Sequence, residues 1–451
     1  MHTMERKRRI MELELSDHYR SLIDIQEGFR IEPNQSRRIP TVLEHLVHQE
    51  RLDALTDKLS RLKPKDFDHR QKLLAYCFEG VQGIEDHLLD LFSKYYREDS
   101  PLVGCARHVR IAAAAALIQA SPYEGLACFN PTLVPHPDQT RLMEGEVRIV
   151  MALRSYGEYH RSAISFRTGV IDDKGYLILD AEKTTENNCS VTVLPKVKGA
   201  QFVFPGDENL NSFVLYGPYM TDIGETWEDP RFTLFVGEGE LNGAYLCTFT
   251  SFNLIKGRLQ PSMIITRDFR TFDYKPLKGS GAEDKDLAFF PKKINNRYAV
   301  LSRNDGQDIY LMTSDDPFSY SKKKKVAGCR PDSFDAHKMG VCAPPIETEA
   351  GWLVIYHGVS DPGQIYSLSA MLLDLEDPSQ VIARLPYTIH SPFFDEAGGM
   401  LNYINYTCGA MVHEATRSLI MPYAINDSYC KVGRISMDEL IARLMDDGRT
   451  A

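Results

Sequence analysis

The sequence predicts a mainly β protein, a five-bladed β-propeller that follows an α-helical N-terminal extension. The first 120 or so residues are rich in Glu, Lys and Leu and poor in β-branched residues, which is typical of helices. From Phe129 onward, short runs of Val, Ile, Tyr, Phe and Thr alternate with Gly, Asp and Asn turns, which is typical of many short strands. A loose internal repeat in this second part favours a propeller over the alternatives, a sandwich or a barrel.

The helical extension is assigned to residues 1–120 and the propeller to residues 121–451. Apolar residues of the extension recur at the spacing of one helical face, at Ile84, Leu88, Leu91, Phe92 and Tyr95. A helical pattern returns only near the end, at Met437 to Leu444. The apolar faces of the extension need a partner surface, which is either the propeller or a second protomer, so a homo-oligomer could form through them.

The repeat consists of a turn that leads into an aromatic-rich strand. It recurs as FFPKKINNRYAVLSRND, PPIETEAGWLVIYHGV and CGAMVHEATRSLIMPYAIND, with EDPRFTLF and AYLCTFTSF as a further copy. A second strand that ends near an acid follows each copy, as SMIITRDF, IYLMTSDD, SAMLLDLEDP and VGRISMDEL, and AISFRTGVIDD comes earlier. Five such units fit five blades.

Polar residues stand at equivalent ends of these units. The innermost strand of each propeller blade lines a central funnel, so equivalent ends of different units converge in space. The residues at such ends are Asp229, Arg303, Asn304, His357 and Asp427. The repeat therefore predicts a polar site on the propeller axis.

Composition and charge exclude several classes of function. The formal net charge of -10 disfavours a nucleic-acid partner. The longest apolar stretch, Ile111 to Ile118, is far shorter than the roughly 18 residues of a membrane span, and the first residues lack the apolar core of a signal peptide. Nine cysteines without a CxxC pair indicate free thiols. We expect a cytoplasmic protein that binds neither nucleic acid nor a membrane.

Motifs for metals, phosphate loops and serine nucleophiles are missing from the sequence. HExxH and CxxC spacings do not occur, so we expect no metal site and no resident cofactor. The stretch GSGAEDK is not a P-loop, because its lysine is not followed by Ser or Thr. GxSxG does not occur either.

The stretch ETWEDPRFTLF places Glu228 and Asp229 directly before a proline and an arginine. Neighbours in a strand point to opposite faces, so we expect one of the two acids to work alone. Pro230 cannot donate to a strand ladder and is expected to begin the strand. The functional interpretation is a single carboxylic acid, its pKa raised by apolar surroundings such as Trp227, that protonates a leaving oxygen. The alternative is an Asx-type turn with a surface arginine.

A basic cluster lies in the following units, at Lys292, Lys293, Arg303 and His357. Such a cluster would suit an anionic co-substrate such as phosphate. The alternative for Lys292 and Lys293 is a solvated turn before Ile294.

Seven segments in order resemble glycoside hydrolase family 130, the β-mannoside phosphorylases and β-mannosidases. They are FNPTLVPHPDQ, ALRSYGEYHRSAISFRTGVID, WEDPRF, AFFPKKINNRYAVLSR, APPIETEAGWLVIYHGV, LLDLEDPSQVIARL and ISMDEL, and the resemblance runs from about residue 110 to the end. It implies a five-bladed propeller with the sugar in its funnel. The helical part resembles an extension that longer members carry.

The resemblance also implies roles for individual residues. The aspartate of the EDPR-type motif supplies the general acid, which is Asp229 here. Asn130, Arg154 and Arg231 would line the sugar site, and Asp427 would bind sugar hydroxyls. Glu228 would face away and support the turn.

Members of the family differ in the nucleophile that attacks the anomeric carbon, which is either water or phosphate. An inverting hydrolase needs a second carboxylate to activate water, whereas a phosphorylase needs a basic pocket for phosphate. Where the family's phosphorylases carry an arginine and a histidine, this chain has Gln260 and Ser302. Lys293, Arg303 and His357 remain as candidate phosphate ligands. For hydrolysis, the candidate bases are Glu347 and Glu396.

The favoured hypothesis is inverting phosphorolysis of β-mannosidic bonds in manno-oligosaccharides. It would release α-mannose 1-phosphate, with inorganic phosphate as a co-substrate and no other cofactor. An inverting β-mannosidase is the alternative, and a non-catalytic carbohydrate-binding propeller is the third. Retention of Asp229 argues against the third, because binding alone does not need an acid at that position.

Overall fold

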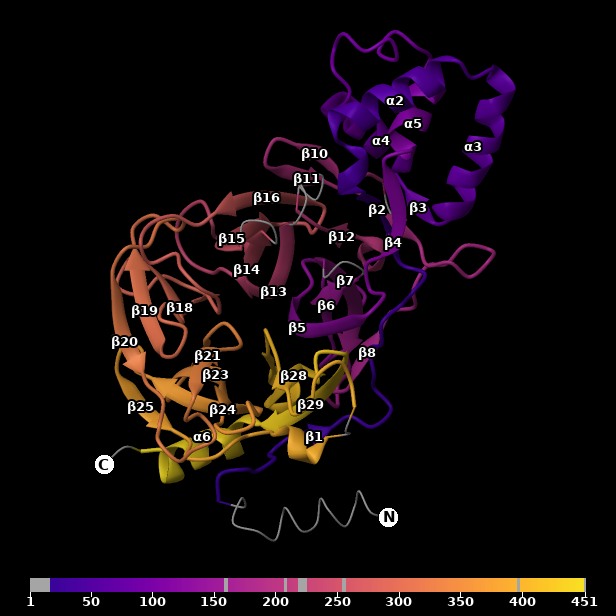
Figure 1. Cartoon of the computed structure of the whole chain (residues 1–451). Helices are drawn as coiled ribbons and strands as arrows, with labels where there is room; N and C mark the ends of the chain where they lie inside the picture. The colour runs from indigo at the N-terminus through magenta and orange to yellow at the C-terminus, as the bar shows by residue number, and fades with distance from the viewer. Residues whose placement is uncertain are drawn as a thin grey trace.

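Five antiparallel sheets surround one axis, with a group of helices to one side (Figure 1). The computed structural model describes residues 17–157, 161–206, 209–217, 225–253, 257–395 and 398–449. The predicted five-bladed propeller is therefore confirmed, and the sandwich and the barrel are not observed.

The blades follow one another along the chain. Blade 1 consists of β5 (Ala127–Pro135), β6 (Val147–Tyr156), β7 (Ser162–Ile171), β8 (Leu177–Leu179) and β12 (Val214–Leu215). Blade 2 consists of β13 (Glu225–Leu234), β14 (Tyr245–Asn253), β15 (Arg258–Thr266), β16 (Thr271–Pro276), β11 (Gln201–Val203) and β10 (Lys196–Lys198). Blade 3 consists of β17 (Ala288–Phe289), β18 (Tyr298–Ser302), β19 (Ile309–Ser314) and β20 (Lys323–Ala327).

Blade 4 consists of β21 (Lys338–Val341), β22 (Ile346–Thr348), β23 (Gly351–Val359), β24 (Tyr366–Leu373) and β25 (Val381–Arg384). Blade 5 consists of β26 (Asn405–Tyr406), β27 (Met411–His413), β28 (Ser418–Ile425), β29 (Tyr429–Ser436) and β1 (Asp24–Ile25). The innermost strands β5, β13, β17, β21 and β26 lie nearest the axis and position the site described below.

The N-terminal part of the chain closes the propeller. Asp24 pairs with Arg434, so β1 is the outer strand of blade 5. Ser436 caps α6 (Met437–Asp447), and Leu440 and Leu444 of this predicted helix are buried beneath blades 4 and 5. The segment assigned to the helical extension, 1–120, therefore contains a strand of the propeller. Its two residues carry no pattern that would distinguish them from a loop.

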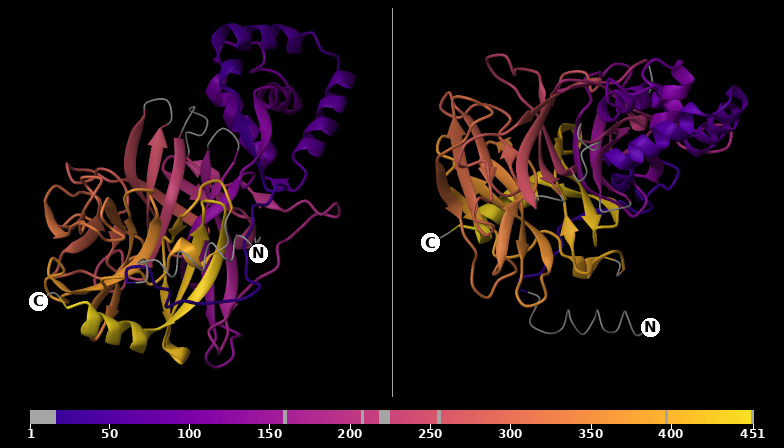
Figure 2. Two further views of the ribbon diagram at one scale, coloured as in Figure 1. Left: turned by 60° about the horizontal axis from the view of Figure 1, so that its bottom comes forward. Right: turned by 45° about the horizontal axis from the view of Figure 1, so that its top comes forward.

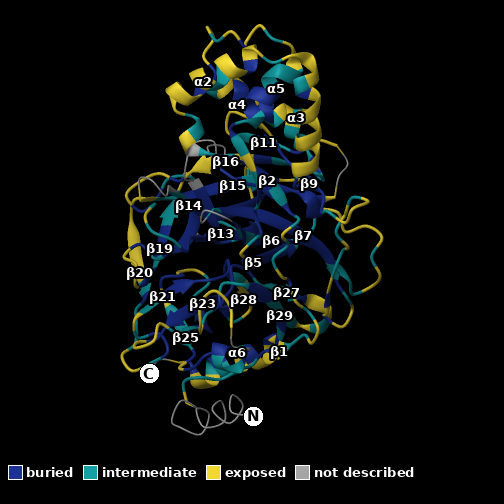
Figure 3. Cartoon of the chain, turned by 45° about the vertical axis from the view of Figure 1, so that its right-hand side comes forward, coloured by how far each residue is buried: buried dark blue, intermediate teal, exposed yellow. Residues whose placement is uncertain are grey.

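The helices form a unit of their own beside blades 1 and 2 (Figure 2). They are α2 (Gln49–Ser60), α3 (Pro64–Cys77), α4 (Ile84–Tyr95) and α5 (Arg107–Ala115), with the short helix η1 (Glu44–Leu46). The predicted helical face at Leu88, Leu91 and Phe92 is buried against α5. Outer faces of α2 and α3 are exposed, whereas the inner strands of the blades are mostly buried (Figure 3).

Two strand pairs and an ion cluster join the helical unit to blade 1. β2 (Arg38–Val42) pairs with β4 (Ile118–Pro122), and β3 (Val81–Gln82) pairs with β9 (Thr192–Val193). Next to β2, Arg37 is 1% exposed and lies 3.5 Å from Glu124, which also accepts two hydrogen bonds from Arg167. Removing one member of such a buried cluster would leave an uncompensated charge, so the cluster stabilises the contact between the helical unit and blade 1.

Bulges interrupt the two inner strands that carry the Asn-Pro and Asp-Pro pairs. The register of β5 shifts between Phe129 and Thr132, and that of β13 shifts between Glu228 and Arg231. Pro230 therefore lies inside β13, and the prediction that it begins the strand is wrong. A bulge leaves a residue unpaired, so a proline without an N–H is accommodated there.

Candidate active site

The carboxylate of Asp229 is held at the β13 bulge by side chains from blade 1. Asp229 has a left-handed backbone, φ 58°, as does Asn130 in the β5 bulge, φ 50°. Asn130 Nδ2 donates to Asp229 Oδ1 at 2.6 Å, and Arg154 Nη1 donates to the same oxygen at 3.2 Å. Left-handed residues other than glycine are uncommon and cluster at functional sites. The two matching bulges bring these two residues together.

Glu228 and Asp229 converge on one arginine. Arg154 Nη2 lies 2.9 Å from Glu228 Oε1, and Lys285 Nζ lies 2.7 Å from Glu228 Oε2. The expectation that the neighbouring acids point to opposite faces, with Glu228 facing away, is wrong. It assumed a regular strand, whereas the bulge turns Asp229 out of the alternation. Arg154 is thus a clamp on two carboxylates.

The pKa of Asp229 is shifted in the direction opposite to the one expected. Burial alone raises the pKa of this carboxyl, but Arg154, Lys285, Arg231 and the hydrogen bond from Asn130 outweigh it, so the net pKa lies below the usual value. The prediction of a raised pKa is wrong for the protein without a ligand. Trp227, the residue proposed to raise it, packs among Phe202, Phe249 and Tyr274 instead.

Asp427 has the raised pKa instead. This residue lies in the turn between β28 and β29 with φ 48°. Burial, opposed by Arg154 and reinforced by nearby Asp229 and Glu228, raises the pKa of its carboxyl to about 6. The structure therefore brings Asp427 to the two acids, as the repeat predicted. Carboxyls whose pKa values are pushed apart in this way are suited to acid–base chemistry.

Arg231 connects the acids to the inner strands of blades 3 to 5. It is 2% exposed, and its guanidinium donates to the Asp229 carbonyl at 3.0 Å and to Asp286 Oδ1 at 2.8 Å. Tyr406 of β26 accepts from Arg231 at 2.8 Å and donates to the same Asp286 oxygen. Through these contacts Arg231 connects the Asp229 backbone to Asp286 and Tyr406, and its place in the sugar site stays a prediction.

Arg303 and His357 lie together at the next two blades. Arg303 Nη1 lies 3.1 Å from Asp286 Oδ2, and its Nε donates to Asp284 at 3.2 Å. The His357 ring lies 4.9 Å from the Tyr406 ring. Burial lowers the pKa of His357 to about 3 despite Asp286, so this imidazole is neutral at pH 7. Arg303 and His357, both candidate phosphate ligands, thus lie near the same Asp286 carboxylate, but only Arg303 carries a charge.

Gly340 of β21 makes this approach of His357 and Asp286 feasible. A Cβ at this position would lie 2.6 Å from His357 Cε1, which is too close for any side chain. Glycine is thus required where two site residues meet the strand backbone.

Two polar atoms at the site are buried with neither a hydrogen bond nor an ion pair to any described residue. They are Asn130 Oδ1 and His357 Nε2. Buried polar atoms in native structures almost always have a partner. These two atoms are therefore candidates for contacts with a ligand.

Two further candidates, Lys293 and Glu347, contact residues outside the group of acids. The Lys293 ammonium lies over the Tyr298 ring, at the start of β18, whereas Arg303 follows the end of that strand. At about 3.3 Å per residue, the backbone positions of Tyr298 and Arg303 are roughly 16 Å apart along the strand. Glu347 is ion-paired with Lys292 at 2.6 Å and is nearly half exposed. Glu396 lies outside the described residues.

The two positions that differ from family phosphorylases have local partners. Gln260 donates to the carbonyls of Pro261 and Leu277, and Ser302 donates to Asn304 at 2.5 Å. Neither side chain contacts the acids through these bonds.

Sequence reasoning missed Lys285, Asp286 and Tyr406. A usable signal was present: Lys285 and Asp286 precede the apolar run of β17 in blade 3, as Glu228 and Asp229 lie in the inner strand of blade 2. Aligning the units from their inner strands would have placed this pair at the funnel. Tyr406 had no comparable signal, because β26 is two residues long.

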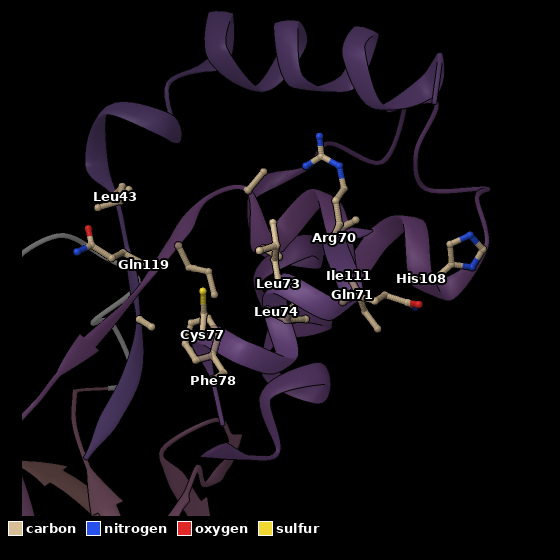
Figure 4. Close-up of a pocket in the computed structure, with 15 residues that line it drawn as sticks. Leu43, Arg70, Gln71, Leu73, Leu74, Cys77, Phe78, His108, Ile111 and Gln119 are labelled. Carbon is tan, nitrogen blue, oxygen red and sulfur yellow. The ribbon is translucent and has the colours of Figure 1, made fainter. Parts of the chain in front are cut away.

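A separate apolar pocket of about 440 Å³ lies in the helical unit. Leu74 and Ile111 line it together with residues of α3, α5 and β4 (Figure 4). It contains none of the acids described above. Within the part of the chain that the structure describes, no group of three or more His, Cys, Asp or Glu is placed to hold a metal ion. None of the described helices combines the length and apolar character of a membrane span.

Comparison with known proteins agrees with this geometry. The sequence model of glycoside hydrolase family 130, described as beta-1,4-mannooligosaccharide phosphorylase, matches residues 105–446. The chain is 32% identical over 191 residues to the beta-1,2-mannobiose phosphorylase of Listeria innocua, a match that covers 41% of this chain and 52% of that enzyme. It is 28% identical over 305 residues to the 1,2-beta-oligomannan phosphorylase of a Thermoanaerobacter species, covering 64% of this chain and 96% of that enzyme.

A solved structure from family 130 has the same fold, and its description says that this family of mannoside phosphorylases contains glycoside hydrolases that target beta-1,2 mannosidic linkages in Candida mannan. Its TM-score is 0.50 at 17% identity, and the match covers 70% of this chain and 86% of that chain. The chain matches about half the length of the Listeria enzyme. The family model, however, spans most of the chain and includes all five inner strands. The chain therefore belongs to glycoside hydrolase family 130, a family of enzymes that act on β-mannosides.

Proposed function

We propose that this protein cleaves β-mannosidic bonds of manno-oligosaccharides by inverting phosphorolysis and releases α-mannose 1-phosphate. The observation that carries the proposal is the buried Asp229 carboxylate, held by Asn130 and Arg154 between the inner strands of blades 1 and 2. The matched curated relatives are mannoside phosphorylases, which supports the mannoside and the use of phosphate.

Asp229 is proposed as the general acid. In the step, its proton moves to the glycosidic oxygen, the bond from that oxygen to the anomeric carbon breaks, and a phosphate oxygen bonds to the carbon from the opposite face. Asp229 is left as a carboxylate that solvent protonates again. The ligand-free pKa of Asp229 opposes this role, but a bound phosphate dianion would add negative charge and raise that pKa.

Asp427 is proposed to keep a proton within the same group of acids. Its pKa of about 6 means that this carboxyl is partly protonated near neutral pH, whereas Asp229 and Glu228 share the charge of Arg154. A protonated carboxyl can donate to a sugar hydroxyl, and an ionised one can accept from it. Asn130 Oδ1, which lacks a protein partner among the described residues, is available to accept a further hydroxyl.

Phosphate is proposed to bind beside blades 3 and 4. Arg303 supplies a guanidinium, neutral His357 can donate from its unpartnered Nε2, and Lys285 and Lys338 add charge nearby. Arginine matches the fork geometry of phosphate oxygens. Asp284, which accepts from Arg303 at 3.2 Å, would yield that contact when phosphate binds. Lys285, which pairs with Glu228 at 2.7 Å, is proposed as the lysine of the site, whereas the Lys293 ammonium lies over the Tyr298 ring.

Hydrolysis is the second candidate, favoured by Gln260 and Ser302 where family phosphorylases carry basic residues. It would need a carboxylate base across the sugar from Asp229. Glu347 does not suit this role, because it pairs with Lys292 on a strand end remote from His357.

Product identification tests the proposal. The protein is incubated with β-1,2- and β-1,4-linked manno-oligosaccharides, with and without inorganic phosphate, and products are followed by ³¹P NMR and chromatography. We expect mannose 1-phosphate only when phosphate is present. Free mannose at equal rates in both incubations would establish the hydrolase instead, and no product from any mannoside would refute both.

A further inference from the structure

A loop at the junction of blades 4 and 5, residues 398–404, is fastened beside Asp427. Asn426 Nδ2 donates to the Gly398 carbonyl at 2.6 Å, and the Ile404 amide donates to Asn426 Oδ1 at 3.0 Å. The Met400 amide donates to Ser428 Oγ at 2.7 Å. Asn426 and Ser428 are the two chain neighbours of Asp427. The loop is therefore anchored next to one of the acids of the site.

The other end of the loop meets the site from blade 4. The Tyr366 amide donates to the Tyr403 carbonyl at 2.9 Å, and the Tyr366 ring stacks on His357 with the ring centres 5.7 Å apart. Two residues after the loop, Tyr406 contacts Arg231 and Asp286. The loop thus lies between Asp427 on one side and His357 on the other, at the rim of the proposed sugar site.

Three apolar side chains of this loop are left about half exposed. Met400 is 46%, Leu401 49% and Tyr403 50% exposed, although the backbone beneath them is fixed by hydrogen bonds. Tyr403 has φ 62°, a conformation that costs a bulky residue on the order of 1–2 kcal/mol. Its ring contacts Phe393, with the ring centres 5.9 Å apart. The fold therefore holds Tyr403 in a strained backbone conformation and leaves about half of its side chain open to solvent.

A sugar ring is the occupant that this arrangement suits best. Carbohydrate sites combine aromatic faces, which cover the apolar C–H face of a pyranose, with polar groups that bind its hydroxyls. Both are present here, because the loop that carries Tyr403 is hydrogen-bonded to Asn426 and Ser428, the chain neighbours of Asp427. A protein partner fits less well, since stable interfaces use about 20–30 residues on each side and this patch has three.

We propose that loop 398–404 forms a leaving-group subsite, in which Tyr403 stacks on the second sugar beyond the scissile bond and so favours longer chains. This inference rests on the proposed function: if the terminal mannose occupies the funnel beside Asp229, the rest of the chain must leave past the rim. Tyr403 is then a specificity residue for substrates of three or more sugars.

The first experiment compares binding of β-mannobiose and β-mannotriose by calorimetry in the Asp229→Asn background, with Tyr403 intact, Tyr403→Phe and Tyr403→Ala. Stacking of this kind contributes about 0.5–1.5 kcal/mol. We therefore expect Tyr403→Ala to weaken mannotriose binding about 3–10-fold and mannobiose binding less, with Tyr403→Phe close to the parent. Tyr76→Ala, which removes a ring that is 77% exposed on α3, is the matched control and should change neither affinity.

The second experiment measures kcat/KM for both sugars in the chain with Asp229 intact. Selective loss for mannotriose in Tyr403→Ala supports the subsite. An equal loss of kcat/KM for both sugars, or no loss, overturns the subsite. Turnover by the unmodified protein would still support the proposed function. If the unmodified protein turns over neither sugar, the proposed function fails, and the calorimetric affinities alone decide the subsite. A greater loss of affinity for mannotriose than for mannobiose in Tyr403→Ala supports it. Unchanged affinities, or no binding of either sugar, overturn it.

Discussion

Replacing Arg154 by methionine would remove the one cation that contacts both Glu228 and Asp229. The two ion pairs measure 2.9 and 3.2 Å, and the three side chains are only 8–14% exposed. Methionine keeps the length of the side chain but leaves two carboxylates side by side in a nearly dry site. Breaking a buried ion pair in this way costs about 3–5 kcal/mol of stability. We expect a loss of this size at pH 7.5, together with nearly complete loss of turnover.

The pH dependence of that loss gives a sharper test. The folded-state pKa of Asp229 is depressed, so its ionisation contributes stability above its unfolded pKa, and that stability is lost as the pH falls through the folded pKa. Without Arg154 the pKa of Asp229 rises, and its ionisation becomes unfavourable. The melting-temperature difference between the two proteins should therefore be large at pH 7.5 and smaller at pH 4.5.

The matched control is Arg148→Met on the same strand. Arg148 lies 3.5 Å from Asp180 in a pair that is about one-third exposed, so it should cost less than about 1 kcal/mol. Scanning calorimetry of both variants across this pH range provides the measurement. Equal melting-temperature differences for Arg154→Met at the two pH values would refute the claim that Arg154 stabilises the ionised carboxylates of Glu228 and Asp229.

Three other variants test the rest of the site. Asp427→Asn should raise the melting temperature at pH 7.5 but not at pH 4, because a folded pKa of about 6 makes ionisation of Asp427 costly above it; a melting-temperature gain at pH 4 as well would contradict this. Arg303→Ala should raise the KM for phosphate at least tenfold, while Lys293→Ala, which removes the cation over Tyr298, should leave it unchanged; equal effects would remove Arg303 from the phosphate site. Gly340→Ala should cost several kcal/mol of stability and most activity, because its Cβ would displace His357; a fully active, stable variant would show that the strand can shift.

The repeat in the sequence was sufficient to predict the propeller and the convergence of distant residues. Five residues were placed from equivalent ends of different units: Asp229, Arg303, Asn304, His357 and Asp427. The structure brings four of them to one region, whereas the Asn304 side chain bonds to Ser302 and to the Gly281 carbonyl. This succeeded because blade strands alternate regularly and their inner ends must meet at the axis.

Details that depend on irregular backbone could not be predicted. The bulges at Asn130 and Asp229 reverse the side-chain alternation on which the separation of Glu228 from Asp229 rested. The sign of a pKa shift depends on which cation is nearest, and Arg154 and Lys285 come from other blades. Lys293 and Lys285 are both lysines near blade 3, and only the fold shows which one faces the acids.

The role of Asp229 is tested most directly by changing the leaving group. Wild-type protein and Asp229→Asn are compared on β-mannobiose and on 2,4-dinitrophenyl β-mannoside, whose leaving group departs without protonation. General acid catalysis contributes about 10²–10⁴-fold. If Asp229 is the acid, Asp229→Asn loses activity of this order on mannobiose in the presence of phosphate but retains most of it on the activated mannoside. Equal losses on the two substrates would contradict the account and assign Asp229 to binding or structure.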